Sequence, residues 1–246
     1  MTDKVYIEEF HYAPIRNHQY DRWFREVPYN GRTLNAKERA MFVSVADETI
    51  ADYAEGLPII AHNLEQIEGK HDEYHEMYRI LLSVMRFVLL TLIDNVVISK
   101  YFILADKDYD RRFMRGKMAV ILNEGFKKLY GFDEKTHKKS EWNKLVAILK
   151  YFPEDIHQQY RHLSSLLEEQ SQSSSWWKEE RNVETHLDAE KLYESRCEEL
   201  IESKVMMDSI KLFNALFAVD SFLTNMHACV NNYLLDLYRQ GLLKEE

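Results

Sequence analysis

The stretch VMMDSIKLFNALFAVDSFLTNMHACVNNYLLDLY, residues 205–238, decides the fold class of this chain. Its apolar residues recur at alternating steps of four and three, the spacing of a helix that buries one face along its whole length. We therefore predict one long helix here, packed as a core helix of a bundle. The residues that define this spacing are Leu212, Leu216, Val219, Leu223, Met226, Val230, Tyr233 and Leu237.

Capping signals mark the first helix of the body. Asn35 can cap a helix over 35–55, and Glu38 three residues later completes the pattern of a capping box. Gly56 and Pro58 follow, and both residue types are common where helices stop. We expect them to end this helix.

Two further helices are predicted from apolar runs in the middle of the chain. The first begins within 60–75 and runs to about Leu104, and a polar break then leads into a helix over 109–130. Gly131 follows that second helix and suits the left-handed position after a helix end. The apolar face of the helix over 109–130 is predicted from residues three and four apart, namely Phe113, Met114, Met118, Ile121, Leu122, Phe126 and Leu129.

Shorter helices are expected further along. One starts at Ser140 or Glu141, Pro153 breaks or kinks it, and a helical stretch then continues to about Glu169. The serine-rich segment 171–175 is expected to be an exposed loop.

Composition favours the same fold class. The chain of 246 residues is 46% hydrophobic but has only 7 Gly and 4 Pro, whereas all-β folds need many turns that use these two residues. Residues 1–34 are rich in aromatic side chains and sustain no helical period. We therefore predict an all-α, up-and-down helical bundle with long helices as a single domain over 35–246, preceded by an irregular aromatic-rich N-terminal arm over 1–34 that packs on the body.

No targeting signal is evident in the sequence. The N-terminus lacks the basic start and apolar run of a signal peptide. The segment 80–104 is the strongest candidate for a membrane span, but Arg86, Asp94 and Lys100 interrupt it, so we interpret it as the central buried helix of the bundle. Two cysteines do not make a disulfide framework for a chain of this length. We expect a cytoplasmic protein without membrane contact.

Charge is unevenly distributed along the chain. The net charge of −9 argues against generic nucleic-acid binding, yet residues 107–150 carry 12 Lys/Arg against 6 Asp/Glu. This segment is either a solvated helix face with a lysine-rich turn or a surface for an anionic ligand. In the second case Arg111, Arg112 and Arg115 are the candidate substrate-binding residues.

One short motif bears on function, namely Arg181-Asn182-Val183-Glu184-Thr185-His186, in a predicted helix over 176–204. An arginine, a polar residue directly after it and a histidine a few positions later, in an all-helical chain, resembles the HEPN superfamily of helical-bundle proteins. The match is specific at three positions only. In that superfamily the motif lies near the start of a helix that follows a loop.

The resemblance implies a metal-independent endoribonuclease of a defence or toxin-type system, acting on RNA without a cofactor or metal. His186 would be the acid/base, because imidazole transfers protons near neutral pH, and Arg181 would hold the phosphate. Asn182 lies four residues before His186 and could fix its tautomer. One chain supplies one Arg and one His, so a complete site suggests a homodimer.

Helix geometry limits how the motif can work. Five residues turn a regular helix by about 140°, so Arg181 and His186 do not share a face. They converge only if the helix begins between them or if the long Arg181 side chain wraps round.

Two other readings remain open. The first is a non-catalytic helical scaffold that binds a protein partner, which fits the acidic composition. The second is a carboxylate/His metal site of the kind found in di-iron bundles, although its residues lie near expected helix ends. The pairs with the required spacing are Glu68–His71, Asp72–His75 and Glu154–His157.

Overall fold

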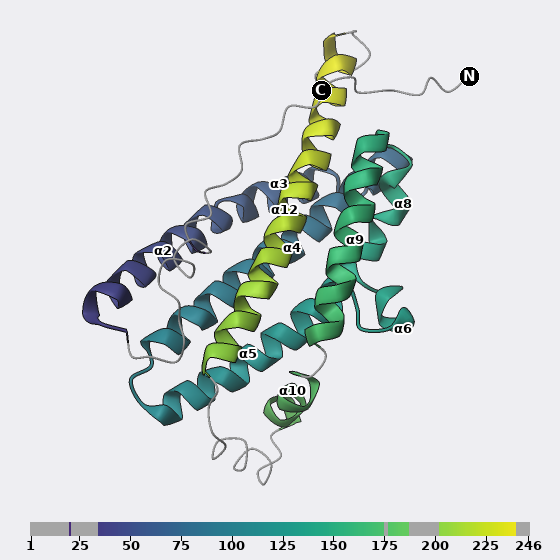
Figure 1. Cartoon of the computed structure of the whole chain (residues 1–246). Helices are drawn as coiled ribbons and strands as arrows, with labels where there is room; N and C mark the ends of the chain where they lie inside the picture. Colours follow the sequence, from purple (N-terminus) through teal and green to yellow (C-terminus); the bar gives the residue numbers. More distant parts are fainter. Residues whose placement is uncertain (1–19, 21–33, 175–176, 187–201, 240–246) are drawn as a thin grey trace.

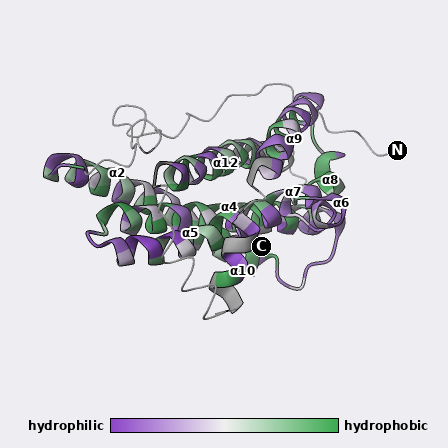
Figure 2. Cartoon of the chain, turned by 60° about the horizontal axis from the view of Figure 1, so that its bottom comes forward, coloured by the Kyte–Doolittle hydropathy of each residue, from purple (hydrophilic) through white to green (hydrophobic). Residues whose placement is uncertain are grey.

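Long antiparallel helices make up the body of the protein (Figure 1). In the computed structural model the chain is described at residue 20 and over 34–174, 177–186 and 202–239. These residues are helical or connecting, with no strand among them, which confirms the all-α class. Figure 2 shows hydrophobic residues along α4 and α12 in the middle of the molecule and hydrophilic residues on α6 and at the free end of α2.

The first two described helices are α2 (Ala36–Ala54) and α3 (Gly56–Gln66). The capping box predicted for α2 is present: the Glu38 amide donates to Asn35 Oδ1 and the Asn35 amide to Glu38 Oε2, both at 3.0 Å. The predicted end of this helix is confirmed, because α2 stops at Ala54 with Glu55 as its C-cap, directly before Gly56. Helix α3, which begins at Gly56 itself, was not predicted. Pro58 lies in the first turn of α3, where its missing N–H has no helical partner to lose.

Helix α4 (Glu73–Leu104) is the central element and packs against α2, α3, α5 and α12. It is the one helix in the described part of the chain that is long and apolar enough to cross a membrane by length and composition alone. Its fully buried residues, Leu81, Val84, Val88, Leu92 and Val96 among them, belong to the common core of the bundle.

Helix α5 (Asp108–Leu129) runs back along α4 (Figure 1). It ends as predicted, with Gly131 in the left-handed region at φ 94° and its N–H donating to the Phe126 carbonyl at 3.1 Å. One residue of the predicted apolar face differs: Phe113 is 40% exposed, and the Lys117 ammonium lies over its ring.

Among the described residues, three short helices and three longer ones follow α5. The short ones are α6 (Glu134–His137), α7 (Glu141–Lys144), which Ser140 caps as expected, and α8 (Val146–Leu149). The longer ones are α9 (Glu154–Ser174), α10 (Trp177–His186) and α12 (Glu202–Arg239).

The predicted loop at 171–175 was wrong for residues 171–174. Helix α9 continues through Ser174, and Ser171 is buried rather than exposed. Of the helix predicted over 176–204, the described parts are α10 and the first residues of α12; residues 187–201 lie outside the described ranges. The seam predicted over 205–238 lies on α12.

Little of the predicted N-terminal arm belongs to the described structure. Tyr20 is buried, and its ring lies 4.6 Å from that of Phe213 and 5.9 Å from that of Phe42. Leu34 is also buried in the core. These two contacts are of the kind expected for an arm that packs on the body; its other residues lie outside the described ranges.

A buried polar cluster joins α4 to α12. The Asn95 side chain donates to the Ser209 carbonyl at 3.0 Å and accepts from the Ser209 hydroxyl at 3.1 Å. The hydroxyls of Ser99 and Ser209 lie 2.6 Å apart, and all three residues are completely buried. This pairing explains why Asn95 and Ser99 are tolerated in the apolar run of α4, because both meet Ser209 on α12.

Asn95→Ala is expected to lower the free energy of unfolding by about 2–3 kcal/mol, because it removes two buried hydrogen bonds between α4 and α12. Urea denaturation measures this loss. The control is Asn214→Ala on the exposed side of α12, for which a change within about 0.5 kcal/mol is expected. Equal effects of the two substitutions would contradict the role given to this cluster.

A second contact between α4 and α12 involves a histidine. His227 Nε2 lies 2.8 Å from the Tyr78 hydroxyl, and the Asn231 amide lies 3.3 Å from Nδ1. The rings of Tyr78 and His227 are stacked with centroids 5.6 Å apart. Desolvation by burial lowers the pKa of His227, so the ring is favoured in its neutral form.

Stability is therefore expected to fall on acidification through the range below about pH 6.5, the pKa of an unfolded-state histidine. The folded-state pKa is the lower one, so the unfolded state binds more protons as the pH falls. Melting temperatures from about pH 7.5 to about pH 5.5 should drop less steeply in His227→Gln than in the wild type. Parallel curves for the two proteins would show that His227 does not contribute.

Candidate functional site

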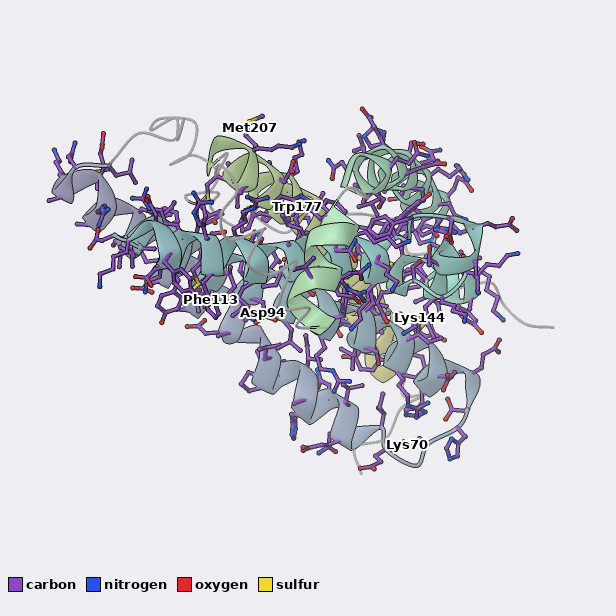
Figure 3. All side chains as sticks on the ribbon, turned by 90° about the horizontal axis from the view of Figure 1, so that it is seen from below. Lys70, Asp94, Phe113, Lys144, Trp177 and Met207 are labelled. Carbon is purple, nitrogen blue, oxygen red and sulfur yellow. The ribbon has the colours of Figure 1, made fainter. Side chains whose placement is uncertain are left out.

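The Arg181–His186 motif lies entirely on α10, which packs mainly against α5. Because the helix contains both residues, it does not begin between Arg181 and His186, and that route to convergence is excluded. The start of α10 is fixed by Trp177, which is completely buried and donates from its indole N–H to Asp208 Oδ2 on α12 at 3.0 Å. Figure 3 shows Trp177 on α10 in front of the bundle.

Two acceptors orient the guanidinium of Arg181. One terminal nitrogen donates to Glu124 Oε1 on α5 in an ion pair, and the other donates to the side-chain oxygen of Asn182 at 2.7 Å. The side chains of Arg181 and Glu124 are 23% and 27% exposed, so solvent reaches the pair. Arg181 and Asn182 thus act together, on the side of α10 that faces α5.

His186 belongs to α10 by its backbone, while its side chain lies outside the described part of the structure. The same holds for the acidic neighbours Glu179, Glu180 and Glu184. The predicted hydrogen bond from Asn182 to His186 therefore stays a prediction. The observed partner of the Asn182 oxygen is Arg181.

Glu124 is a residue that sequence reasoning did not single out, and Lys127 was predicted only as one of the basic residues of the segment 107–150. Lys127 Nζ lies 3.9 Å from Glu124 Oε1, the same oxygen that accepts from Arg181. Glu124 and Arg181 are 57 positions apart, and only the packing of α10 on α5 brings them together. An acidic residue three positions before a lysine is common on helix surfaces and gave no signal of its own.

The three predicted substrate-binding arginines lie elsewhere on α5. Arg111, Arg112 and Arg115 precede Glu124 by 13, 12 and 9 positions, which places them roughly 14–20 Å away along the helix and about 120–180° round its axis. Arg111 donates from Nε to the Ala105 carbonyl at 2.8 Å and so holds the turn between α4 and α5. The structure does not bring these arginines to the Arg181–Glu124 pair.

Lys117 lies on the same side of α5 as Glu124. Lys117 precedes it by seven positions, which is about 20° round the helix and about 10 Å along it. The Lys117 ammonium lies 5.0 Å from the centre of the Phe113 ring. In Figure 3 Phe113 lies on α5, to the left of α10. Lys117 therefore lies on the side of α5 that carries Glu124, and Lys127 contacts Glu124 itself.

The residues of two predicted carboxylate/His pairs, Asp72–His75 and Glu154–His157, cap helices or make surface contacts. Asp72 caps α4 through the His75 amide at 3.1 Å and also pairs with the His75 ring. Glu154 pairs with Arg161, while His157 contacts the Phe152 carbonyl. Within the ranges that the structure describes, no three or more His, Cys, Asp or Glu side chains come together as a metal site would need.

The α5–α10 contact provides groups suited to an anion. Two cations from different helices, Arg181 and Lys127, converge on one oxygen, and the guanidinium is a donor whose geometry matches carboxylate and phosphate. Comparisons with protein-family models, curated proteins and solved structures found no match to this chain.

Proposed function

We propose that this chain is a HEPN-like protein and, within that class, a metal-independent endoribonuclease whose site contains Arg181, Asn182 and His186. One observation carries the proposal: Arg181 and Asn182 are adjacent, hydrogen-bonded to each other and partly exposed on a short helix beside Lys127. An arginine held by a neighbouring amide is suited to receive a phosphate in a fixed orientation.

In the proposed reaction the RNA 2′-hydroxyl attacks the adjacent phosphorus. A bond forms from the 2′-oxygen to phosphorus and the bond to the 5′-oxygen breaks, which leaves a cyclic phosphate and a 5′-hydroxyl. His186 exchanges the protons, since imidazole titrates near neutral pH. Arg181 donates to the phosphate oxygens, where negative charge builds up in the transition state.

A homodimer is part of this proposal. The attacking hydroxyl must lose a proton and the leaving oxygen must gain one, whereas each chain has one motif histidine. A twofold axis that brings two α10 helices together supplies a second histidine and arginine. Arg111, Arg112 and Arg115 would then contact RNA further along α5, away from the reacting phosphate.

A second candidate function is a non-catalytic helical scaffold that binds a protein partner. The ion pair between Arg181 and Glu124 favours it, because that contact holds α10 against α5 in a structural role. In this case Arg181 stabilises the packing of α10 on α5 and does not bind a phosphate.

Cleavage of labelled RNA by the purified protein in EDTA separates the candidates. The ribonuclease proposal expects cleavage that survives EDTA and leaves ends with a cyclic phosphate and a 5′-hydroxyl. Absence of cleavage by folded, dimeric protein would favour the scaffold. Cleavage that EDTA abolishes would instead point to the carboxylate/His pairs.

A further inference from the structure

We infer that Glu124 Oε1 occupies the position of an RNA phosphate oxygen, and that Lys127 is a second phosphate-binding residue beside Arg181. The inference rests on the proposed function and adds to it a substrate-binding residue and a competitor for the substrate. Neither Glu124 nor Lys127 belongs to the motif, and both come from α5 rather than α10.

The contacts at one oxygen atom carry the inference. Arg181 donates to Glu124 Oε1, and Lys127 Nζ lies 3.9 Å from the same atom. Two cationic side chains from two helices thus point at a single position that now holds a carboxylate oxygen. Carboxylate and phosphate oxygens accept from guanidinium and ammonium groups in the same way, so a phosphate oxygen fits there when the carboxylate moves aside.

The site is open enough for an exchange of anions. The side chains of Arg181, Glu124 and Lys127 are 23%, 27% and 40% exposed. A partly exposed ion pair contributes little net stability, so turning Glu124 toward solvent has a small energetic cost. The position would then face the two positive charges of Arg181 and Lys127, which favours the anionic backbone of RNA.

Lys127 is held less closely than a matched lysine elsewhere. Glu141 and Lys144 on α7 have the same spacing of three residues and similar exposure, 20% and 49%, and their charged atoms are 2.6 Å apart. In Glu124–Lys127 the separation is 3.9 Å, beyond hydrogen-bonding distance. Arg181 takes the carboxylate oxygen, and the Lys127 ammonium retains capacity for a further anion.

Glu124 is accordingly a positioning residue in the free protein and a competitor during binding. It holds the Arg181 guanidinium in place, and the substrate phosphate must displace it. Removing its charge should strengthen RNA binding, whereas removing the Lys127 charge should weaken it. A purely structural ion pair predicts neither change.

The test uses a mixed-sequence 2′-O-methyl RNA, which lacks the attacking hydroxyl, with the full chain and several salt concentrations. Fluorescence anisotropy gives Kd for the wild type, Glu124→Gln and Lys127→Gln, and circular dichroism checks folding. We expect Glu124→Gln to bind about three- to tenfold more tightly and Lys127→Gln to bind weaker by a similar factor. Lys127→Gln should also reduce the salt slope of log Kd by about 0.7, as for one lost phosphate contact to a single strand.

Matched controls are Glu141→Gln and Lys144→Gln, which make the same charge changes in the i,i+3 pair on α7. We expect them to change Kd by less than about twofold, as for a screened charge away from the binding site. In the cleavage assay Lys127→Gln should raise KM more than it lowers kcat.

The outcomes distinguish this inference from the proposed function. If the wild type binds and cleaves RNA but the α5 variants behave like their α7 controls, the two-cation site is overturned and the ribonuclease proposal stands. If neither the wild type nor Glu124→Gln binds or cleaves RNA, the proposed function fails and this inference fails with it.

Discussion

Gly131→Ala is expected to lower the free energy of unfolding by about 3 kcal/mol or more, since it combines backbone strain with a steric clash. Gly131 has φ 94°, a conformation that residues with a Cβ atom rarely adopt. A Cβ atom there would lie 2.4 Å from the His137 amide nitrogen and 2.7 Å from its Cα. These are backbone atoms of the following turn, and no side-chain rotation relieves the contact.

Gly69→Ala is the matched control, because Gly69 also has a positive φ, 77°, but its Cβ would meet no atom within 4 Å. It should lose only the conformational part, about 1 kcal/mol. Urea denaturation of both variants and the wild type gives the two losses. Equal losses would mean that the turn after α5 adjusts to the added Cβ atom, so that the close approach to His137 does not affect the free energy of unfolding.

The turn at Gly131 matters for the site because it closes the C-terminal end of α5. His137 Nδ1 lies 2.8 Å from the Tyr130 carbonyl, and the two rings are 4.4 Å apart. Glu124 and Lys127 lie within the last two turns of this helix. A loosened end of α5 should therefore reduce RNA binding as well as stability.

Two helix ends could be predicted from the sequence, because the interactions that form them involve only residues a few positions apart. The Asn35–Glu38 capping box and Gly131 are of this type, because each acts on backbone groups within a few positions. The same local reasoning gave the end of α2 at Glu55 correctly but missed α3, which begins at Gly56 and has Pro58 in its first turn. Proline stops a helix that precedes it but is well tolerated in the first turn of a new one, and the residue type does not reveal which case applies.

Burial depends on distant packing and was predicted less well. The serines at 171–174 have the composition of a loop, yet α9 continues through them and Ser171 is buried. Phe113 has helical spacing with the apolar residues of α5 but is 40% exposed, because the buried residues of α5 begin only at Gly116.

The candidate site was predicted only where its residues are adjacent in sequence. Arg181 and Asn182 were identified from the motif, and the structure joins their side chains. Glu124 and Lys127 could not be identified, because their role follows from how α10 packs on α5, across 57 positions of sequence. Both motif residues lie on one helix, which excludes one of the two predicted routes by which Arg181 and His186 could converge, and the route through the long Arg181 side chain stays a prediction.

His186→Ala and Arg181→Ala are each expected to lower the rate of RNA cleavage by about 100-fold or more. Loss of a general acid or base typically reduces a rate by about 10²–10⁴, and loss of a charge-stabilising donor by about 10²–10³. Controls of the same residue types are His162→Ala and Arg161→Ala on α9, both exposed in the structure. They should cleave within about twofold of the wild type, as surface substitutions outside the site do.

The measurement that tests the account most directly is single-turnover cleavage of RNA in EDTA by the wild type, the two motif variants and the two α9 controls, with end-group analysis of the products. We expect cyclic-phosphate ends from the wild type and from both controls, and their loss in His186→Ala and Arg181→Ala at unchanged melting temperature and dimerisation. Cleavage that persists in folded motif variants, or a folded wild-type dimer that leaves RNA intact, would contradict the proposed function.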